Sequence, residues 1–231
     1  MVENKQTLSS LCCPVKTAPF HFGAIVLAAG ASTRMGAPKQ LLRLGGRTLL
    51  RRTVDAVLAS PAWPVVVVLG AHLDAIRPEV ARLPVLVVEN SAWEEGLASS
   101  IRAGARVLAS FSLSLDAALL VLCDQPNLSP EAIARLADAT VESGKTIVAA
   151  RYGDHSGPPA LFSRRHFQEL TELRGPGGAR PLLARHADLV AMVDLPELAA
   201  DLDTPAEYAS FQRTLENEPS VPTNASSSTS S

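Results

Sequence analysis

The sequence lacks the features that mark several large classes of protein. Its three cysteines, Cys12, Cys13 and Cys123, supply neither a disulfide framework nor the spacing of a metal site, a usage typical of the reducing cytoplasm. No apolar run is long enough to span a membrane, and the N-terminus lacks the basic and apolar segments of a secretory signal. The net charge of −2 gives no general attraction for nucleic acid. We therefore expect a cytoplasmic protein that binds neither membranes nor nucleic acid.

The histidines offer little sign of a metal site. His21, His72, His155, His166 and His186 are not closely paired along the chain. We expect each of them on the surface or in a loop rather than as a metal ligand. No Ser-His-Asp arrangement stands out in the sequence either.

Two common phosphate-binding motifs are also missing. A P-loop has four residues between its glycines and then Lys and Ser or Thr, whereas five residues separate Gly30 from Gly36 and Lys39 is followed by Gln40. The G-x-G-x-x-G fingerprint of dinucleotide-binding proteins is absent after Gly30. This absence argues against a nicotinamide-dependent oxidoreductase.

A different glycine-containing loop is present. The apolar run that ends at Leu27 leads into a loop of small residues, which carries Arg34 and Lys39. Small residues allow the backbone to approach a ligand closely, loop N–H groups bind anions, and the two basic side chains add positive charge. An ordinary strand-to-helix connection would share the glycines, but the basic residues favour a loop that binds the phosphates of a nucleotide.

Strand and helix patterns alternate along the chain, and 47% of its 231 residues are hydrophobic. Strands are expected at 24–27, 65–69, 85–88, 117–122, 146–149 and 189–193. Helices are expected at 40–58, 75–82, 99–108, 130–143, 164–173 and 178–186, with Ser129 as an N-cap before Pro130. Such alternation predicts a single Rossmann-like α/β domain, with a mostly parallel sheet between two helical layers. We place this domain at residues 22–214, after a flexible extension (1–21) and before a disordered Ser/Thr-rich tail (215–231).

Candidate site residues follow the expected strands, because ligands of parallel sheets bind outside the carboxyl ends of the strands. Asp124 follows one strand and Asp203 precedes an expected helix; each is either an oxygen ligand for Mg²⁺ or a turn or helix cap. The polar segment at 89–100 precedes another helix; it is either a plain loop with Ser99 or Ser100 as the cap, or a helix N-terminus that contacts a base or an anion. Sequence spacing alone does not bring Asp203 near Asp124.

Several ordered motifs between Gly23 and Phe211 resemble those of the MobA-like nucleotidyltransferases, most closely the molybdenum cofactor cytidylyltransferases within that family. They are the loop at 27–39, Asn90-x-x-Trp93-x-x-Gly96-Leu97-Ala98-Ser99-Ser100, Leu122-Cys123-Asp124-Gln125-Pro126, Gly157-x-Pro159-x-x-Phe162, Gly178-Ala179-Arg180 and Asp201-Leu202-Asp203-Thr204-Pro205. The resemblance implies the three-layer α/β/α nucleotidyltransferase fold.

The resemblance also implies an activity, namely transfer of CMP from CTP to the terminal phosphate of molybdopterin cofactor with Mg²⁺ and release of pyrophosphate. It makes Arg34, Lys39 and Asp124 catalytic, and Asp124 and Asp203 ligands of Mg²⁺. The nucleotide-binding residues that it implies are Leu27, Ala28, Ala29, Gly30, Ser32, Arg34, Lys39, Asn90, Gly96, Ser99 and Ser100. Related guanylyltransferases tend to have glycine where this chain has Ala29, so the resemblance favours cytosine.

Two departures from the family pattern concern the second substrate. The family commonly has Gly-His-Pro where this chain has Gly157-Pro158-Pro159, and Gly-Asp where it has Gly175-Pro176. Another phosphorylated acceptor is therefore an alternative. So is a non-catalytic chaperone that delivers the cofactor to a molybdenum hydroxylase apoenzyme, a protein that would also be a partner of the enzyme.

Overall fold

The computed structural model describes residues 19–200 and 202–217. Its strands span Phe22–Ala28 (β1), Arg43–Leu44 (β2), Arg47–Thr48 (β3), Val65–Leu69 (β4), Leu86–Glu89 (β5), Ala117–Leu122 (β6), Ile147–Tyr152 (β7), His155–Ser163 (β8) and Val190–Asp194 (β9). Its helices span Leu49–Leu58 (α1), Leu73–Ile76 (α2), Leu97–Ala109 (α3), Pro130–Ser143 (α4), Phe167–Glu172 (α5), Arg180–Arg185 (α6) and Pro205–Asn217 (α7). Within these residues, no helix is both long and apolar enough to cross a membrane.

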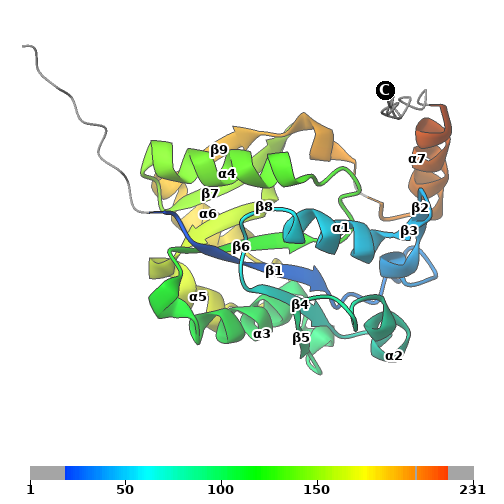
Figure 1. Ribbon diagram of the computed structural model, residues 1–231, viewed down its shortest axis with the longest axis horizontal. Coiled ribbons are helices and arrows are strands. Elements are labelled where there is room, and N and C mark those ends of the chain that lie inside the picture. Colours follow the sequence, from blue (N-terminus) through cyan, green and yellow to red (C-terminus); the bar gives the residue numbers. More distant parts are fainter. Residues whose placement is uncertain (1–18, 201, 218–231) are drawn as a thin grey trace, which may run out of the picture.

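Seven of the strands form one sheet in the order β5-β4-β1-β6-β8-β7-β9 (Figure 1). β8 runs antiparallel to both of its neighbours, β6 and β7, whereas the other pairings of this sheet are parallel. The expected α/β fold with a mostly parallel sheet is confirmed. β8 was not expected, because its sequence contains Gly157, Pro158 and Pro159, which do not resemble a regular strand.

Helices cover both faces of the sheet because its strands are apolar on both faces. Along β1, Ala24, Val26 and Ala28 pack in one cluster with α1 and α4, and Ile25 and Leu27 pack in another with α3, α5 and α6. Successive side chains of a strand point to opposite faces, so one short apolar run contributes to both layers. Figure 1 shows α1 and α4 on one side of the sheet and α3 and α5 on the other.

The expected helix at 40–58 is wrong in its first half. A 3₁₀ turn at Lys39–Leu41 is followed by a hairpin of β2 and β3, and α1 begins only at Leu49. Gly45 and Gly46 have φ values of 56° and 80°, a conformation that suits a hairpin turn and interrupts a helix. Thr48 then caps α1, because its Oγ1 accepts a hydrogen bond from the backbone N–H of Arg51 at 3.2 Å.

The other helices differ less from expectation. Ser129 caps α4 as expected, accepting a hydrogen bond from the N–H of Ala132 at 3.2 Å. The expected helix at 75–82 is a short α2 and a 3₁₀ turn that contains Pro78. Helix α7 continues to Asn217, past the expected start of the tail at residue 215, and residues 1–18 and 218–231 of the expected extension and tail lie outside the described residues.

Gly104 allows α3 to lie close against the sheet. A Cβ atom at this position would lie 2.4 Å from Ile25 Cγ2 and 3.1 Å from Val68 Cγ2, inside a well-packed core. We expect Gly104→Ala to lower the free energy of unfolding by about 1 to 2 kcal/mol, because the cost of overpacking exceeds the gain in helix propensity. Urea unfolding measures this change. Arg106→Ala on the exposed side of α3 is the control and should change stability by less than about 0.5 kcal/mol, and an equal effect of the two variants would contradict the prediction.

Candidate nucleotide and metal site

The loop after β1 is held in shape by Gln40. This side chain is buried, and its Nε2 donates hydrogen bonds to the backbone oxygens of Ala28 at 3.0 Å and Gly30 at 2.8 Å. Ser32 has a positive φ of 56°, and its hydroxyl accepts a hydrogen bond from the N–H of Lys39 at 3.1 Å and donates one to Gln40 Oε1 at 3.3 Å. The two ends of the loop are therefore tied together, which brings Lys39 back to the carboxyl end of β1.

A cavity of about 470 Å³ opens beside this loop. Of the residues expected at the site, those that line it are Leu27, Ala28, Ala29, Gly30, Arg34, Lys39, Gly96, Ser100, Asp124 and Asp203. Residues that line it but were not included among the expected site residues are Ala31, Gln40, Trp93, Glu94, Leu97, Leu122, Cys123 and Arg180. Arg180 begins α6 and belongs to the Gly178-Ala179-Arg180 motif, so the sequence motif could have identified it as a candidate site residue.

Three of the expected nucleotide-binding residues do not line the cavity. Ser32 shapes the loop, as described above. Asn90 is buried and donates from Nδ2 to Ser99 Oγ at 2.8 Å and to Ser100 Oγ at 3.1 Å. The two serines were candidate caps of the next helix, but α3 begins after Gly96 and both lie within its first turn. Asn90 and Ser99 thus join the end of β5 to α3 and support the wall of the cavity.

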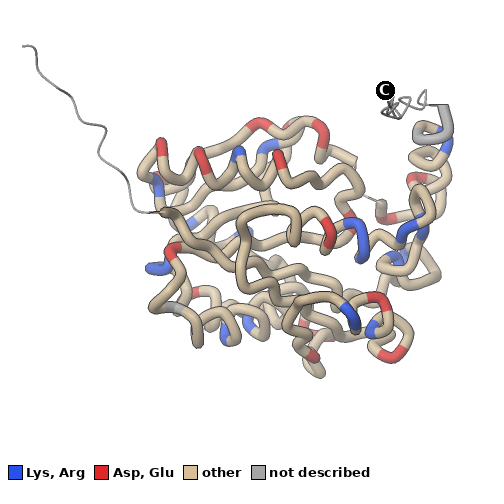
Figure 2. The backbone as a smooth tube through the Cα atoms, viewed as in Figure 1, with Lys and Arg blue, Asp and Glu red and all other residues tan. Residues whose placement is uncertain are grey.

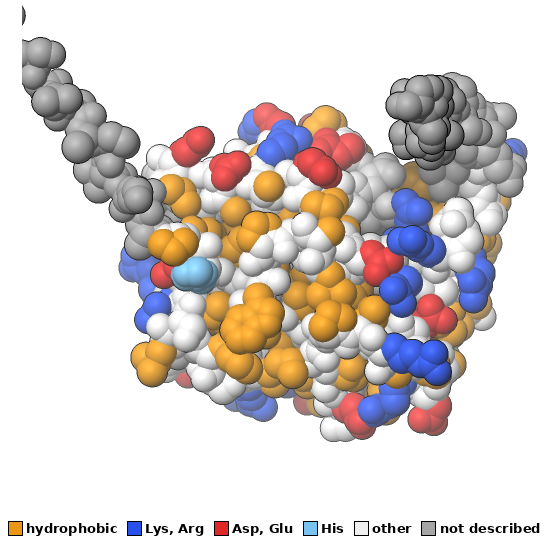
Figure 3. All heavy atoms as spheres, in the orientation of Figure 1, with side chains coloured by type: hydrophobic (Ala, Val, Ile, Leu, Met, Phe, Trp, Pro, Cys, Tyr) orange, Lys and Arg blue, Asp and Glu red, His pale blue; other side chains and the backbone are white. Residues whose placement is uncertain are grey.

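Lys39 joins the two expected metal ligands. Its Nζ lies 2.5 Å from Asp124 Oδ2 and 2.9 Å from Asp203 Oδ1. Arg34 Nη2 lies 2.7 Å from Asp203 Oδ2, although the Arg34 side chain is 71% exposed. The structure therefore brings Arg34, Lys39, Asp124 and Asp203 together at the carboxyl ends of β1 and β6. Figures 2 and 3 show that Lys and Arg residues gather at the end of the molecule that holds β2, β3 and α1.

Asp203 reaches Asp124 through backbone contacts and a capping box. The N–H of Leu202 donates to the backbone oxygen of Asp124 at 3.3 Å, and the buried Leu202 side chain packs in a cluster with Leu44 and Leu49. Glu207 Oε2 accepts hydrogen bonds from the N–H groups of Asp203 and Thr204, and Thr204 Oγ1 accepts one from the N–H of Glu207. Because Thr204 and Glu207 cap α7, the Asp203 carboxylate remains available to the cavity.

The site holds its charges over a wide pH range. Burial acts to lower the pKa of Lys39, but the Asp124 and Asp203 carboxylates outweigh it and raise that pKa above its ordinary value. For Asp203, burial acts to raise the pKa, and the cations Lys39 and Arg34 outweigh it and lower the pKa. Burial, together with the nearby Asp124 charge, raises the pKa of Cys123 to about 12. Cys123 is buried in the core, and it remains a thiol.

Asp124 has one oxygen available for a further cation. Its Oδ1 is buried and has no hydrogen-bond partner among residues 19–200 and 202–217. A buried carboxylate oxygen is costly to leave unpaired, and Mg²⁺ commonly binds one or two carboxylates together with substrate phosphates. The donor atoms of Asp124 and Asp203 therefore fit a divalent metal ion.

A second, smaller cavity adjoins the first. It has a volume of about 230 Å³ and shares Leu97, Leu122 and Arg180 with the larger one. The two residues that depart from the family pattern, Pro158 and Pro176, both line it. A Cβ atom on Gly96 would lie 2.9 Å from Pro176 Cα, so the glycine allows the 175–178 segment to pack against the start of α3.

One expectation about the histidines is wrong. His166 is buried, and its ring centroid lies 4.9 Å from that of His186. The two residues are separated by 20 positions in the sequence, and they meet because His166 precedes α5 and His186 follows α6. Linear spacing gave no signal of this contact.

We expect Gln40→Leu to weaken both the fold and nucleotide binding. Two backbone oxygens of the loop would lose their hydrogen-bond donor, which should lower the free energy of unfolding by about 1 to 3 kcal/mol. KM for the nucleotide should rise more than turnover falls, since Gln40 shapes the loop. Urea unfolding and steady-state kinetics measure these changes. The exposed Gln168→Leu serves as a control, and an unchanged KM in Gln40→Leu would rule out the positioning role.

Comparison with known proteins shows what this site resembles. The MobA-like NTP transferase domain matches residues 24–202 of the chain. Nicotine blue oxidoreductase of Paenarthrobacter nicotinovorans is 31% identical over 192 residues, which cover 78% of this chain and 91% of that protein. Molybdenum cofactor guanylyltransferase of Shewanella putrefaciens is 24% identical over 198 residues, covering 84% of this chain and 97% of that protein.

A solved structure adds an observation about metal. Rv0371c of Mycobacterium tuberculosis, in complex with manganese, superimposes with a TM-score of 0.68 at 30% identity, covering 85% of this chain and 99% of that one. These three proteins match this chain over 91% to 99% of their own length, while the first two are named for different activities.

Proposed function

This chain belongs to the MobA-like NTP transferase family, and we propose that it transfers CMP from CTP to the terminal phosphate of molybdopterin cofactor, with Mg²⁺ and with release of pyrophosphate. One observation carries the proposal: Lys39 joins Asp124 and Asp203 beside the small-residue loop that follows β1. Cations that suit a triphosphate thus lie next to carboxylates that suit a divalent metal ion.

The proposed reaction needs positioning and charge rather than a side-chain nucleophile. An oxygen of the acceptor phosphate attacks the α-phosphorus of CTP, and the bond to pyrophosphate breaks in line with this attack. Arg34 and Lys39 bind the phosphates and reduce the repulsion between two anionic substrates, while the loop backbone holds the triphosphate. Asp124 and Asp203 would hold Mg²⁺, which when bound stabilises charge on the phosphate oxygens.

The second cavity is the proposed place of the acceptor. It adjoins the nucleotide cavity, and Arg180 lines both, so a phosphate at their junction would meet a guanidinium group. Pro158 and Pro176 make this cavity less polar than the His and Asp of the family pattern would. A different phosphorylated acceptor, such as a sugar or polyol phosphate, is therefore the alternative within the same reaction class.

The choice of cytosine rests on Ala29. This residue lines the nucleotide cavity, and its methyl group occupies space that a glycine would leave open. The smaller pyrimidine is the base that we assign to this site, which Gly96 and Ser100 also line.

The second candidate function is that of a nicotinamide-dependent oxidoreductase. One observation supports it, the 31% identity to a protein named nicotine blue oxidoreductase. Against it stands the missing dinucleotide fingerprint after Gly30. A cofactor-delivering chaperone is the remaining alternative, and the charged site at Lys39 speaks for catalysis instead.

The test is a reaction with molybdopterin cofactor, Mg²⁺ and either CTP or GTP, followed by identification of the dinucleotide and the pyrophosphate. We expect the cytosine dinucleotide. Pyrophosphate release only with a sugar or polyol phosphate would reassign the acceptor. Binding of CTP without release of pyrophosphate would favour the chaperone, and oxidation of a nicotinamide cofactor in a parallel reaction would favour the oxidoreductase.

A further inference from the structure

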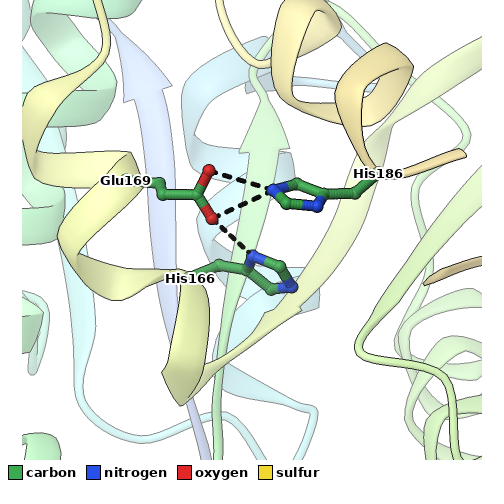
Figure 4. A group of neighbouring side chains, drawn as sticks. All are labelled: His166, Glu169 and His186. Atoms are coloured by element: carbon green, nitrogen blue, oxygen red, sulfur yellow. Dashed lines mark hydrogen bonds and ion pairs between the residues drawn. The ribbon is translucent and has the colours of Figure 1, made fainter.

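Two histidines and a glutamate meet far from the nucleotide cavity. His166 Nδ1 lies 2.9 Å from Glu169 Oε1, and His186 Nε2 lies 2.9 Å from Oε2 and 3.1 Å from Oε1 of the same carboxylate (Figure 4). The three side chains come from the turn before α5, from α5 itself and from the residue after α6. Figure 4 shows that all three point toward one another.

The cluster lies at the end of the strands opposite the end that forms the nucleotide cavity. Thr146, which contacts His166, directly precedes β7, and β7 runs parallel to β6 because both are antiparallel to β8. The start of β7 is therefore at the opposite end from the carboxyl ends of β1 and β6, where Lys39 and Asp124 lie. A ligand bound here would not touch the nucleotide site.

We propose that His166, Glu169 and His186 bind one divalent transition-metal ion, with Zn²⁺ as the best match. One ligand atom from each residue lies within 4.8 Å of the others, and two imidazole nitrogens with one carboxylate oxygen form a common zinc ligand set. Tetrahedral coordination leaves a fourth position for water.

A supporting contact holds the His166 ring. Thr146 Oγ1 lies 2.9 Å from His166 Nε2, so the ring presents Nδ1 to Glu169. Metal-binding histidines usually donate their other N–H to such a partner, which fixes the ring and its tautomer. In the ion-free cluster Nδ1 faces the Glu169 carboxylate as a donor; with the ring proton on Nε2 instead, donated to the Thr146 hydroxyl, Nδ1 would be free as a ligand.

The carboxylate of Glu169 can be reached from the surface. Glu169, with Glu172 and Arg185, lines a surface hollow of about 350 Å³, which gives an ion a path to the cluster. Arg185 Nη1 lies 3.2 Å from Glu169 Oε2 and is the cation that a metal ion would displace.

A bound ion would join α5 to the C-terminal end of α6. The first residue of α6, Arg180, lines the nucleotide cavity, so the ion would stabilise the helix that carries this side chain. We expect the ion to raise the stability of the helical layer made by α5 and α6.

The test is a calorimetric titration of the metal-stripped full chain with ZnCl₂, made in an Asp124→Asn/Asp203→Asn background so that the nucleotide site lacks its two proposed metal ligands. We expect His186→Ala and Glu169→Gln to weaken one Zn²⁺ site by at least about 100-fold, since removal of a mere supporting partner already costs about 10- to 100-fold. The exposed His155→Ala should bind as the parent does. Glu169→Gln keeps the size of the side chain and guards against misfolding.

A spectroscopic measurement provides the second readout. Co²⁺ added in place of Zn²⁺ should give the visible absorption of a tetrahedral site in the parent and in His155→Ala, and this absorption should be lost in His186→Ala. The melting temperature should rise with Zn²⁺ in the parent and not in Glu169→Gln. Equal Zn²⁺ affinity in all variants, or no binding in the parent, would overturn the proposal.

Discussion

Asp124→Ala is expected to lower the turnover of nucleotidyl transfer by two or more orders of magnitude in a chain that remains folded. Asp124 Oδ2 bonds Lys39, and Oδ1 is buried without a partner in the described part of the chain, so this residue is the best placed ligand for a divalent metal ion. Loss of a group that stabilises transition-state charge typically costs about 100- to 1,000-fold in turnover. Pyrophosphate release at saturating nucleotide and acceptor measures the effect.

A matched control separates this effect from instability. Asp138→Ala removes an exposed carboxylate from α4, and its turnover should equal that of the parent. Raising the Mg²⁺ concentration should not restore Asp124→Ala, because the ligand itself is missing. Near-normal turnover of a folded Asp124→Ala chain would remove Asp124 from the metal site and leave its contact with Lys39 as its whole role.

The regular elements of this fold were predictable where local signals agree with the tertiary structure. Strands β4 and β6 are continuous apolar runs buried between two helical layers, and α4 begins at Ser129-Pro130 with a capping serine. The prediction of a helix over all of 40–58 was wrong in its first half. The apolar spacing of this segment fits a helix, but the pair Gly45-Gly46 forms a hairpin turn within it. β8 was not predicted because glycine and proline have poor strand propensity. In the structure, its pairing with β6 and β7 outweighs that propensity.

The sequence predicted in part which candidate residues lie close together, but not how they are arranged. The rule that ligands bind at the carboxyl ends of parallel strands located Lys39 and Asp124 at one edge. Asp203 lies near Asp124 because of a backbone contact between Leu202 and Asp124. These two residues are 78 positions apart, so no local sequence signal predicts their contact. The contact between His166 and His186 likewise depends on how α5 and α6 pack.

Lys39→Ala should reduce turnover by a similar factor of 100 or more, for a different reason. Lys39 is the cation shared by Asp124 and Asp203, so its loss leaves two carboxylates close together without their common partner. The variant therefore loses a phosphate ligand and also repels the incoming triphosphate more strongly. KM for the nucleotide should rise together with the fall in turnover, whereas a metal-ligand variant is expected to affect mainly turnover.

The pH dependence of turnover shows whether Lys39 and Asp203 act as fixed charges or whether one of them acts as a general base. The pKa of Lys39 is raised, so the ammonium persists as the pH rises through the ordinary range of lysine; the pKa of Asp203 is lowered, so its carboxylate persists as the pH falls below the ordinary range of aspartate. The parent should thus show turnover independent of these two groups between about pH 5 and pH 9. The raised pKa of Lys39 also contributes stability, which is complete below the pKa of an unfolded lysine and is lost as the pH rises through the higher folded value. The lowered pKa of Asp203 contributes stability that is complete above the pKa of an unfolded aspartate and is lost as the pH falls through the lower folded value.

Lys39→Arg is the informative companion variant. It keeps the positive charge but replaces a compact ammonium by a planar fork that does not fit between two carboxylate oxygens at 2.5 and 2.9 Å. We expect it to recover nucleotide binding more than turnover, as measured by KM and by pyrophosphate release. Full activity of Lys39→Ala in a folded chain would contradict the assignment of Lys39 to the phosphates, and a titration of the parent's turnover near neutral pH would point to another group as a general base.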